Sequence, residues 1–87
     1  MQWSEEAREI LEAMMMELPL PVRDGVRQVA ELRAETVCAE AGVEPVTLEA
    51  AVRAFIEATP SDLRQRLKHS LSYHGIDPED YDAAFDA

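Results

Sequence analysis

Two prolines separated by a single leucine, Pro19-Leu20-Pro21, interrupt a sequence that otherwise has the apolar spacing of helices. A proline has no N–H to donate and pushes the preceding residue out of the α region, so a helix cannot continue through Pro19. Pro21 can instead serve as the first residue of the following helix. The sequence therefore predicts two helices that meet at a corner over residues 19–21 and fold back on each other as an antiparallel hairpin.

The helix before the corner is predicted over residues 4–18, with Ser4 as its N-cap. Its apolar stripe contains Trp3, Ala7, Ile10, Leu11, Met14 and Leu18. Of three consecutive methionines, Met14 falls in the middle of this stripe, Met15 at its edge and Met16 on the opposite side. We expect the first two to fill the core, as flexible thioethers do, and Met16 to be exposed.

The helix after the corner is predicted to end at Gly42, because glycine readily takes the positive φ of a helix C-terminus. The face expected to be buried contains Val22, Val26, Val29, Ala30, Val37 and Ala41. Arg33 interrupts it, and we expect this arginine to extend to solvent or to pair with an acid. Cys38, the only cysteine, is expected to behave as a small buried hydrophobe.

Three shorter helices are expected in the rest of the chain. The first is capped by Thr47, the second begins at 59–62 and ends at Gly75, and the third begins at 77–80. Their expected apolar residues are Leu48, Val52, Phe55 and Ile56, then Leu63, Leu67 and Leu71, then Tyr81, Ala84 and Phe85. The predicted fold class is all-α: a small bundle of four to five short helices built on the antiparallel hairpin, in a single domain over residues 1–87.

Composition narrows the classes of function. The chain has 18 acidic against 8 basic residues and a formal net charge of −10, which repels nucleic-acid phosphates and anionic membrane surfaces. It has no apolar run long enough to span a membrane and no signal-peptide pattern. Together with the single cysteine, these features lead us to expect a cytoplasmic protein that binds neither nucleic acid nor membranes.

Arg23 and Arg27 are four residues apart near the start of the second helix and can line up on one side of it. They can clamp a carboxylate or a propionate-bearing ligand, or they can pair with Glu31, Asp24 or acids of the first helix. The cluster Arg64, Arg66 and Lys68 fans out around its helix, which favours a solvated face.

The chain offers little for catalysis or metal binding. His69 and His74 are five residues apart and fall on different sides of a helix, so a shared metal site is not expected. No spacing brings an acid, a base and a nucleophile together. We therefore expect no catalytic residue, no metal and no cofactor, and hence no enzyme activity of the chain by itself.

A further pattern runs through the first part of the chain. It contains Trp3, Glu6, Ala7 and Leu11, then Pro19-Leu20-Pro21-Val22-Arg23, Val26-Arg27, Glu31, Ala34, Gly42, Val46-Thr47 and Glu49. In this order the residues resemble the small C-terminal domain of the B subunit of light-independent protochlorophyllide reductase. The resemblance covers residues 1–57 and leaves 58–87 as additional C-terminal helices with an acidic end. Both predicted hairpin helices are longer than in that family by about four residues, close to one turn.

The resemblance implies a link to chlorophyll biosynthesis, but the nitrogenase-like part of that subunit is missing and one cysteine cannot hold an iron–sulfur cluster. We therefore expect a non-catalytic docking or accessory module for an oxidoreductase, with a nitrogenase-like reductase subunit as the implied partner. Arg23 and Arg27 would be charged anchors, and Trp3 and Met16 an apolar contact that also suits a homodimer. The alternative is a small regulatory or carrier protein that binds an anionic ligand, such as a tetrapyrrole, through Arg23 and Arg27.

Overall fold

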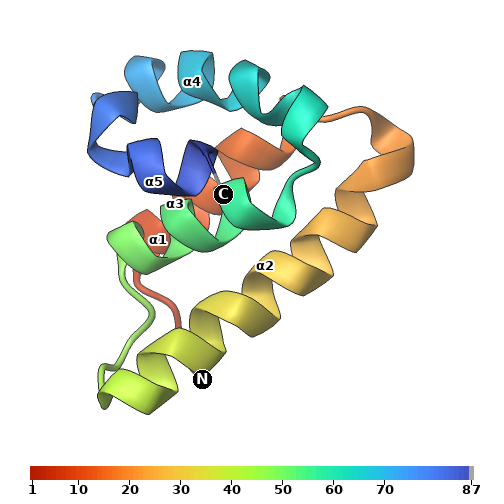
Figure 1. Cartoon of the computed structure of the whole chain (residues 1–87). Coiled ribbons are helices and arrows are strands. Elements are labelled where there is room, and N and C mark those ends of the chain that lie inside the picture. The colour runs from red at the N-terminus through yellow and green to blue at the C-terminus, as the bar shows by residue number, and fades with distance from the viewer. Residues whose placement is uncertain (87) are drawn as a thin grey trace.

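The structure, a computed structural model, describes residues 1–86 and is a bundle of helices (Figure 1). The α-helices are α1 (Glu5–Met15), α2 (Leu20–Ala41), α3 (Leu48–Ala58), α4 (Arg64–Tyr73) and α5 (Asp82–Phe85), with 3-10 turns at Ser61–Leu63 and Pro78–Tyr81. Within the described range, β-type pairing is limited to an isolated parallel bridge between Trp3 and Val46. The predicted all-α class is confirmed.

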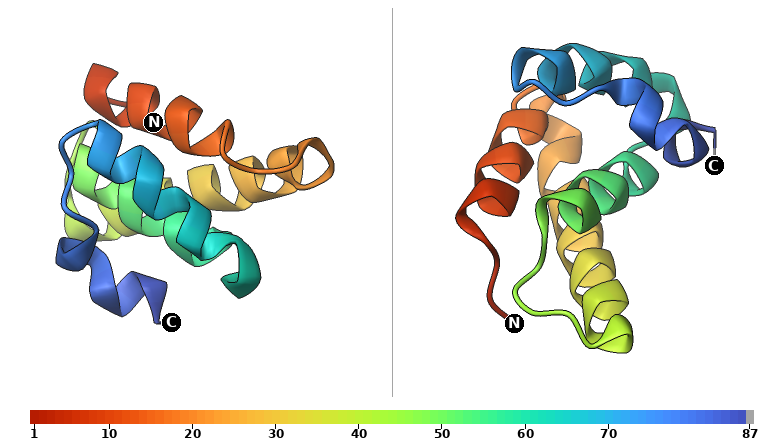
Figure 2. Two further views of the ribbon diagram at one scale, coloured as in Figure 1. Left: turned by 90° about the horizontal axis from the view of Figure 1, so that it is seen from above. Right: turned by 90° about the vertical axis from the view of Figure 1, so that its left-hand side faces the viewer.

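The first two helices run antiparallel on either side of the proline corner, as both views in Figure 2 show. α1 ends at Met15, earlier than predicted: the Met16 N–H still bonds four residues back, to the Glu12 carbonyl, but the N–H groups of residues 17 and 18 bond only three residues back, as in a turn. Leu18 is nevertheless buried. Pro19 stands at the N-cap of α2, and Pro21 lies in its first turn.

Local capping chemistry defines most helix ends. The Ser4 hydroxyl accepts a hydrogen bond from the Ala7 N–H at 3.1 Å, and the Thr47 hydroxyl accepts one from the Ala50 N–H at 3.2 Å. Gly42 ends α2 with φ 69°, a left-handed conformation that costs glycine little. Thr59 differs from the prediction: its hydroxyl donates to the Phe55 carbonyl at 2.8 Å, so it closes α3 instead of starting the next helix.

α3 is the central helix of the core, packed against both α1 and α2 and also against α5. Its buried residues include Val52, Phe55 and Ile56. The large side chains buried around them include Leu11, Met14, Leu18, Leu67 and Leu71. The two hairpin helices are thus joined mainly through a third helix that fills the space beside them.

The buried face of α2 differs from the predicted one. The buried residues are Val26, Ala30, Ala34 and Cys38, whereas Val29, Val37 and Ala41 are exposed. The buried positions follow one row with four-residue spacing, and its small side chains let α3 approach closely. The exposed valines lie off that row, because only the row faces α3.

Candidate functional site

Arg27 bridges the two antiparallel helices. Its Nη2 atom pairs with Oε1 of Glu12 on α1, and its Nε atom lies 3.8 Å from Oε2 of Glu31, one turn further along α2. The guanidinium therefore lies between two carboxylates. A ligand carboxylate would have to compete with both of them.

Arg23 contacts the corner. Its Nε atom donates to the Leu18 carbonyl at 2.8 Å, and its Nη2 atom donates to the Met16 carbonyl at 3.3 Å. These carbonyl groups follow the C-terminal end of α1, where the helix dipole favours a cation. Arg23 and Arg27 thus lie on the same side of α2 but bind different groups, so the structure does not bring them together around an open site.

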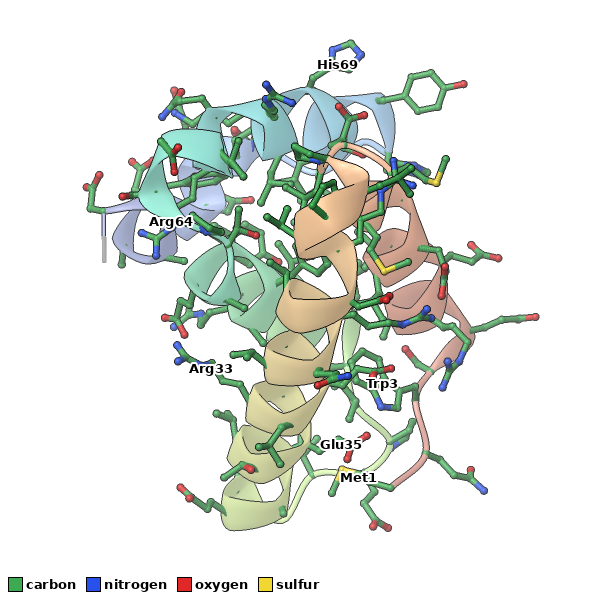
Figure 3. All side chains as sticks on the ribbon, turned by 90° about the vertical axis from the view of Figure 1, so that its right-hand side faces the viewer. Met1, Trp3, Arg33, Glu35, Arg64 and His69 are labelled. Atoms are coloured by element: carbon green, nitrogen blue, oxygen red, sulfur yellow. The ribbon has the colours of Figure 1, made fainter. Side chains whose placement is uncertain are left out.

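Trp3 and Glu35 connect the segment before α1 with α2 (Figure 3). The indole Nε1 atom of Trp3 donates to Oε2 of Glu35 at 2.8 Å. The guanidinium of Arg8 lies 5.8 Å from the centroid of the indole ring, within reach of a cation–π contact. A shallow groove of about 520 Å³ lies beside the ring and is lined by Trp3, Ser4, Glu5, Arg8, Glu9 and Glu12. The carboxylates of this groove disfavour an anionic ligand.

Met16 is exposed, as predicted, with 66% of its surface accessible at the corner. Leu20, which begins α2, is also exposed. The other large apolar residues exposed on α2 are Val29, Leu32 and Val37.

An uncharged stripe covers the face of α2 that points away from the core. The outer stripe, as we name it, consists of Gly25, Val29, Leu32, Thr36 and Ala39, all exposed. Their alternating spacing of four and three residues places them on one face of a helix. With 1.5 Å per residue, the stripe is about 21 Å long. In Figure 3, α2 stands in front of the other helices and nothing covers this face.

Charged residues border the outer stripe on both sides. Asp24, Glu31 and Glu35 follow one border, and Arg33 and Glu40 follow the other. Figure 3 shows Glu35 and Arg33 projecting to opposite sides of α2. The Arg33 Nη1 atom lies 3.2 Å from Oε1 of Glu57 on α3. Arg33, the basic residue of this border, is therefore paired with an acid, which is one of the two outcomes expected for it from the sequence.

Sequence reasoning missed the outer stripe, because it assigned Val29 to the core and gave Leu32 no role. The signal that identifies the stripe is the contrast between two spacings on one helix. Residues 26, 30, 34 and 38 repeat every four positions, whereas residues 25, 29, 32, 36 and 39 alternate four and three. The second pattern is the spacing of residues that contact a partner helix in coiled coils.

Arg64 corrects the expectation that the basic cluster of α4 is a solvated face. This arginine is buried, and its Nε atom donates to the Thr59 carbonyl at 2.9 Å. Its terminal nitrogens donate to carbonyls of Glu57, Ala84 and Phe85 at 3.3 to 3.4 Å. Arg64 thus joins the C-terminal ends of α3 and α5, which both favour a positive charge.

Tyr81 is a buried titratable residue near the C-terminal end of the described range. Burial raises the pKa of Tyr81 above its usual 10.0, and Glu49 and Asp80 raise it further, while Arg53 lowers it. Its hydroxyl therefore stays protonated at neutral pH. His69 and His74 are both exposed.

Among residues 1–86, no group of three or more His, Cys, Asp or Glu residues is arranged to hold a metal ion. No helix in the same range combines the length and apolarity needed to cross a bilayer.

Comparison with known families corrects the resemblance noted in the sequence. The family model described as "Protein of unknown function (DUF2621)" matches residues 1–85, and nothing supports a protochlorophyllide reductase domain or a link to chlorophyll biosynthesis. The residues that carried the resemblance are largely those of a proline corner followed by an amphipathic helix, a local pattern that unrelated helical proteins can share. No curated protein and no solved structure shows significant similarity to the chain. From residue 1 to residue 85, the chain belongs to the DUF2621 family.

Proposed function

We propose that this chain is a non-catalytic docking module that binds a protein partner through the outer stripe of α2. The observation that supports the proposal is the exposure of Val29 and Leu32, at 46% and 69%, in the middle of an uncharged helix face. Apolar side chains exposed together on one helix face and bordered by charged residues are one feature of binding sites for other proteins. The docking function is the one expected from the sequence, but the contact surface is the outer stripe and not Arg23, Arg27, Trp3 and Met16.

The side chains first considered as anchors already have partners within the chain, which supports placing the contact surface on the outer stripe instead. Arg27 is paired with Glu12 and Glu31, and Arg23 is bonded to carbonyls of the corner. Trp3 is bonded to Glu35. These side chains make contacts within the fold, between α2 and the segments around it. Because both arginines already have partners, the alternative of an anionic ligand held by Arg23 and Arg27 is less favoured.

The shape of α2 adds a second line of support. A helix of 22 residues is about 33 Å long, so α2 spans the whole of the longest dimension of the molecule, which is 32 Å. One of its faces forms the core with α3, and the opposite face lies along the outside. A long, straight exposed face is suited to contact a partner over several turns.

Site-specific photo-crosslinking tests the proposal. A photoreactive amino acid replaces Leu32 or Thr36 on the outer stripe, or Gln65, an exposed residue of α4, as the control. We expect one and the same protein to be captured from positions 32 and 36 in the cells that produce the chain, and not from position 65. Capture from none of these positions, or equally from all three, would contradict the proposal.

A further inference from the structure

We propose that the element that binds the outer stripe is an amphipathic helix whose apolar anchors are flanked by lysines or arginines. This inference rests on the docking function proposed above and specifies the chemistry of the partner. It follows from the spacing within the stripe and from the charges along its two borders.

The spacing favours a helix as the bound element. In the outer stripe Val29 and Leu32 project side by side, and the stripe narrows to the small residues Gly25 at one end and Ala39 at the other. Side chains of a second helix fit such a surface, with the two axes about 8–10 Å apart. An extended peptide gains less here, because the backbone groups of α2 are already bonded within the helix and offer no sheet edge for pairing.

The borders favour a basic helix. Four of the five border residues are acidic, namely Asp24, Glu31, Glu35 and Glu40. The fifth, Arg33, is paired with Glu57, and of the acidic residues only Glu31 has an arginine nearby, at 3.8 Å, among the ion pairs of residues 1–86. A helix that seats its apolar side on the outer stripe therefore places its flanking positions beside carboxylates, and lysine or arginine is favoured there.

The same charges disfavour a second copy of the chain as the occupant. Two copies joined through their outer stripes would bring acidic borders together, and each copy carries a net charge of −10. The apolar contact against this repulsion would consist mainly of Val29 and Leu32 from each copy. Like charges placed opposite each other at an interface suppress such a pairing.

Two synthetic peptides test the inference on the full chain. Both are helical, about 18 residues and thus about 27 Å long, with identical leucine anchors, and the flanking positions carry lysine in one and glutamate in the other. Binding is followed by the NMR amide shifts of the isotope-labelled chain. We expect the lysine peptide to bind at least about tenfold more tightly than the glutamate peptide and to shift the amides of Gly25, Val29, Leu32, Thr36 and Ala39.

Matched variants and salt sharpen the test. Leu32→Asp should abolish binding of the lysine peptide, whereas Val37→Asp, at an exposed valine of α2 outside the stripe, should leave it within about twofold. Raising the salt from about 0.15 M to about 1 M shortens the Debye length from about 8 to 3 Å and should narrow the preference for lysine. Thermal unfolding of each variant checks that the chain still folds.

Three results would overturn the inference: equal binding of both peptides, binding of neither, or shifts away from the outer stripe. A dimer of the free chain that sedimentation detects and Leu32→Asp dissociates would overturn it in favour of a second copy. In each case photo-crosslinking from positions 32 and 36 decides separately whether the docking function itself survives.

Discussion

The two faces of α2 show that burial in this small bundle follows the shape of the neighbouring helix and not hydrophobicity alone. On the inner face, Ala34 is completely buried beside α3, although an alanine side chain has little apolar surface to remove from water. On the outer face, the more hydrophobic Leu32 is 69% exposed. The small side chains of the inner row let α3 pack closely against it, whereas Val29 and Leu32 lie on the outer face, where no helix of the chain covers them.

The difference between the two faces assigns stability to the inner row and partner binding to the outer stripe. A reading of α2 as one apolar face would give both roles to the same residues. An inner position is constrained by a fixed volume, so its mutation should change stability. An outer position has no partner within the chain, so its mutation should change binding and leave stability nearly unaltered. Four predictions, ordered by the expected size of the effect, test the separation.

The largest effect is expected in the core itself, at Phe55 of α3. Phe55→Ala removes a completely buried aromatic side chain and should lower the free energy of unfolding by about 3–5 kcal/mol. Urea unfolding followed by circular dichroism measures the change. Tyr73→Ala is the matched control, because this aromatic residue of α4 is 81% exposed and its loss should cost far less. Similar losses for both variants would show that the inner core is not where stability is concentrated.

The second prediction compares one substitution on both faces of the same helix. Ala34→Leu adds volume to the inner row against α3 and should destabilise the chain by about 1–3 kcal/mol. Ala39→Leu adds the same atoms to the outer stripe, where the space is open, and should change stability by less than about 0.5 kcal/mol. Denaturant midpoints of the two variants provide the measurement, and equal midpoints would contradict the assignment of the two faces.

The sequence predicted features that depend on neighbours in the chain. The corner at Pro19, the caps at Ser4 and Thr47 and the left-handed end at Gly42 each arise from chemistry within a few residues. The exposure of Met16 followed from its angle on the first helix. The corner, the caps and the glycine stop predicted the all-α class and left the number of helices at four to five, of which the described residues form five α-helices.

Features that depend on distant segments could not be predicted. Which face of α2 is buried depends on where α3 crosses it, so Val29 and Ala34 could not be ranked by hydrophobicity. Arg64 was misjudged because carbonyls that it binds belong to α5, about 20 residues away, and become available only when that helix folds back. The spacing of the outer stripe was present in the sequence. The row 26, 30, 34 and 38 of the same helix is equally regular, however, and the sequence does not say which of the two rows faces the core.

The third prediction concerns Arg27, which lies between the two faces at the side of α2 next to α1. Arg27→Met keeps an unbranched apolar stem but removes the guanidinium and with it the ion pairs with Glu12 and Glu31. The loss of these partly exposed pairs should cost no more than about 1 kcal/mol, measured as a shift of the unfolding midpoint. Binding of the lysine-flanked peptide to the outer stripe should persist. Loss of that binding with unchanged stability would return Arg27 to the candidate contact surface.

The smallest effect on stability is expected at Leu32, and it is the most direct test of the open face. Leu32→Ser should change the free energy of unfolding by no more than about 0.5 kcal/mol, because the side chain has few neighbours to lose within the chain. The measurement should be made at two protein concentrations, since a face covered by a second copy would make stability rise with concentration. A large loss of stability in the variant, or a dependence on concentration in the parent chain, would show that the outer stripe is already occupied. A small and concentration-independent change would leave the stripe free for another protein, and in that case its exposed leucine has no role in the stability of the fold.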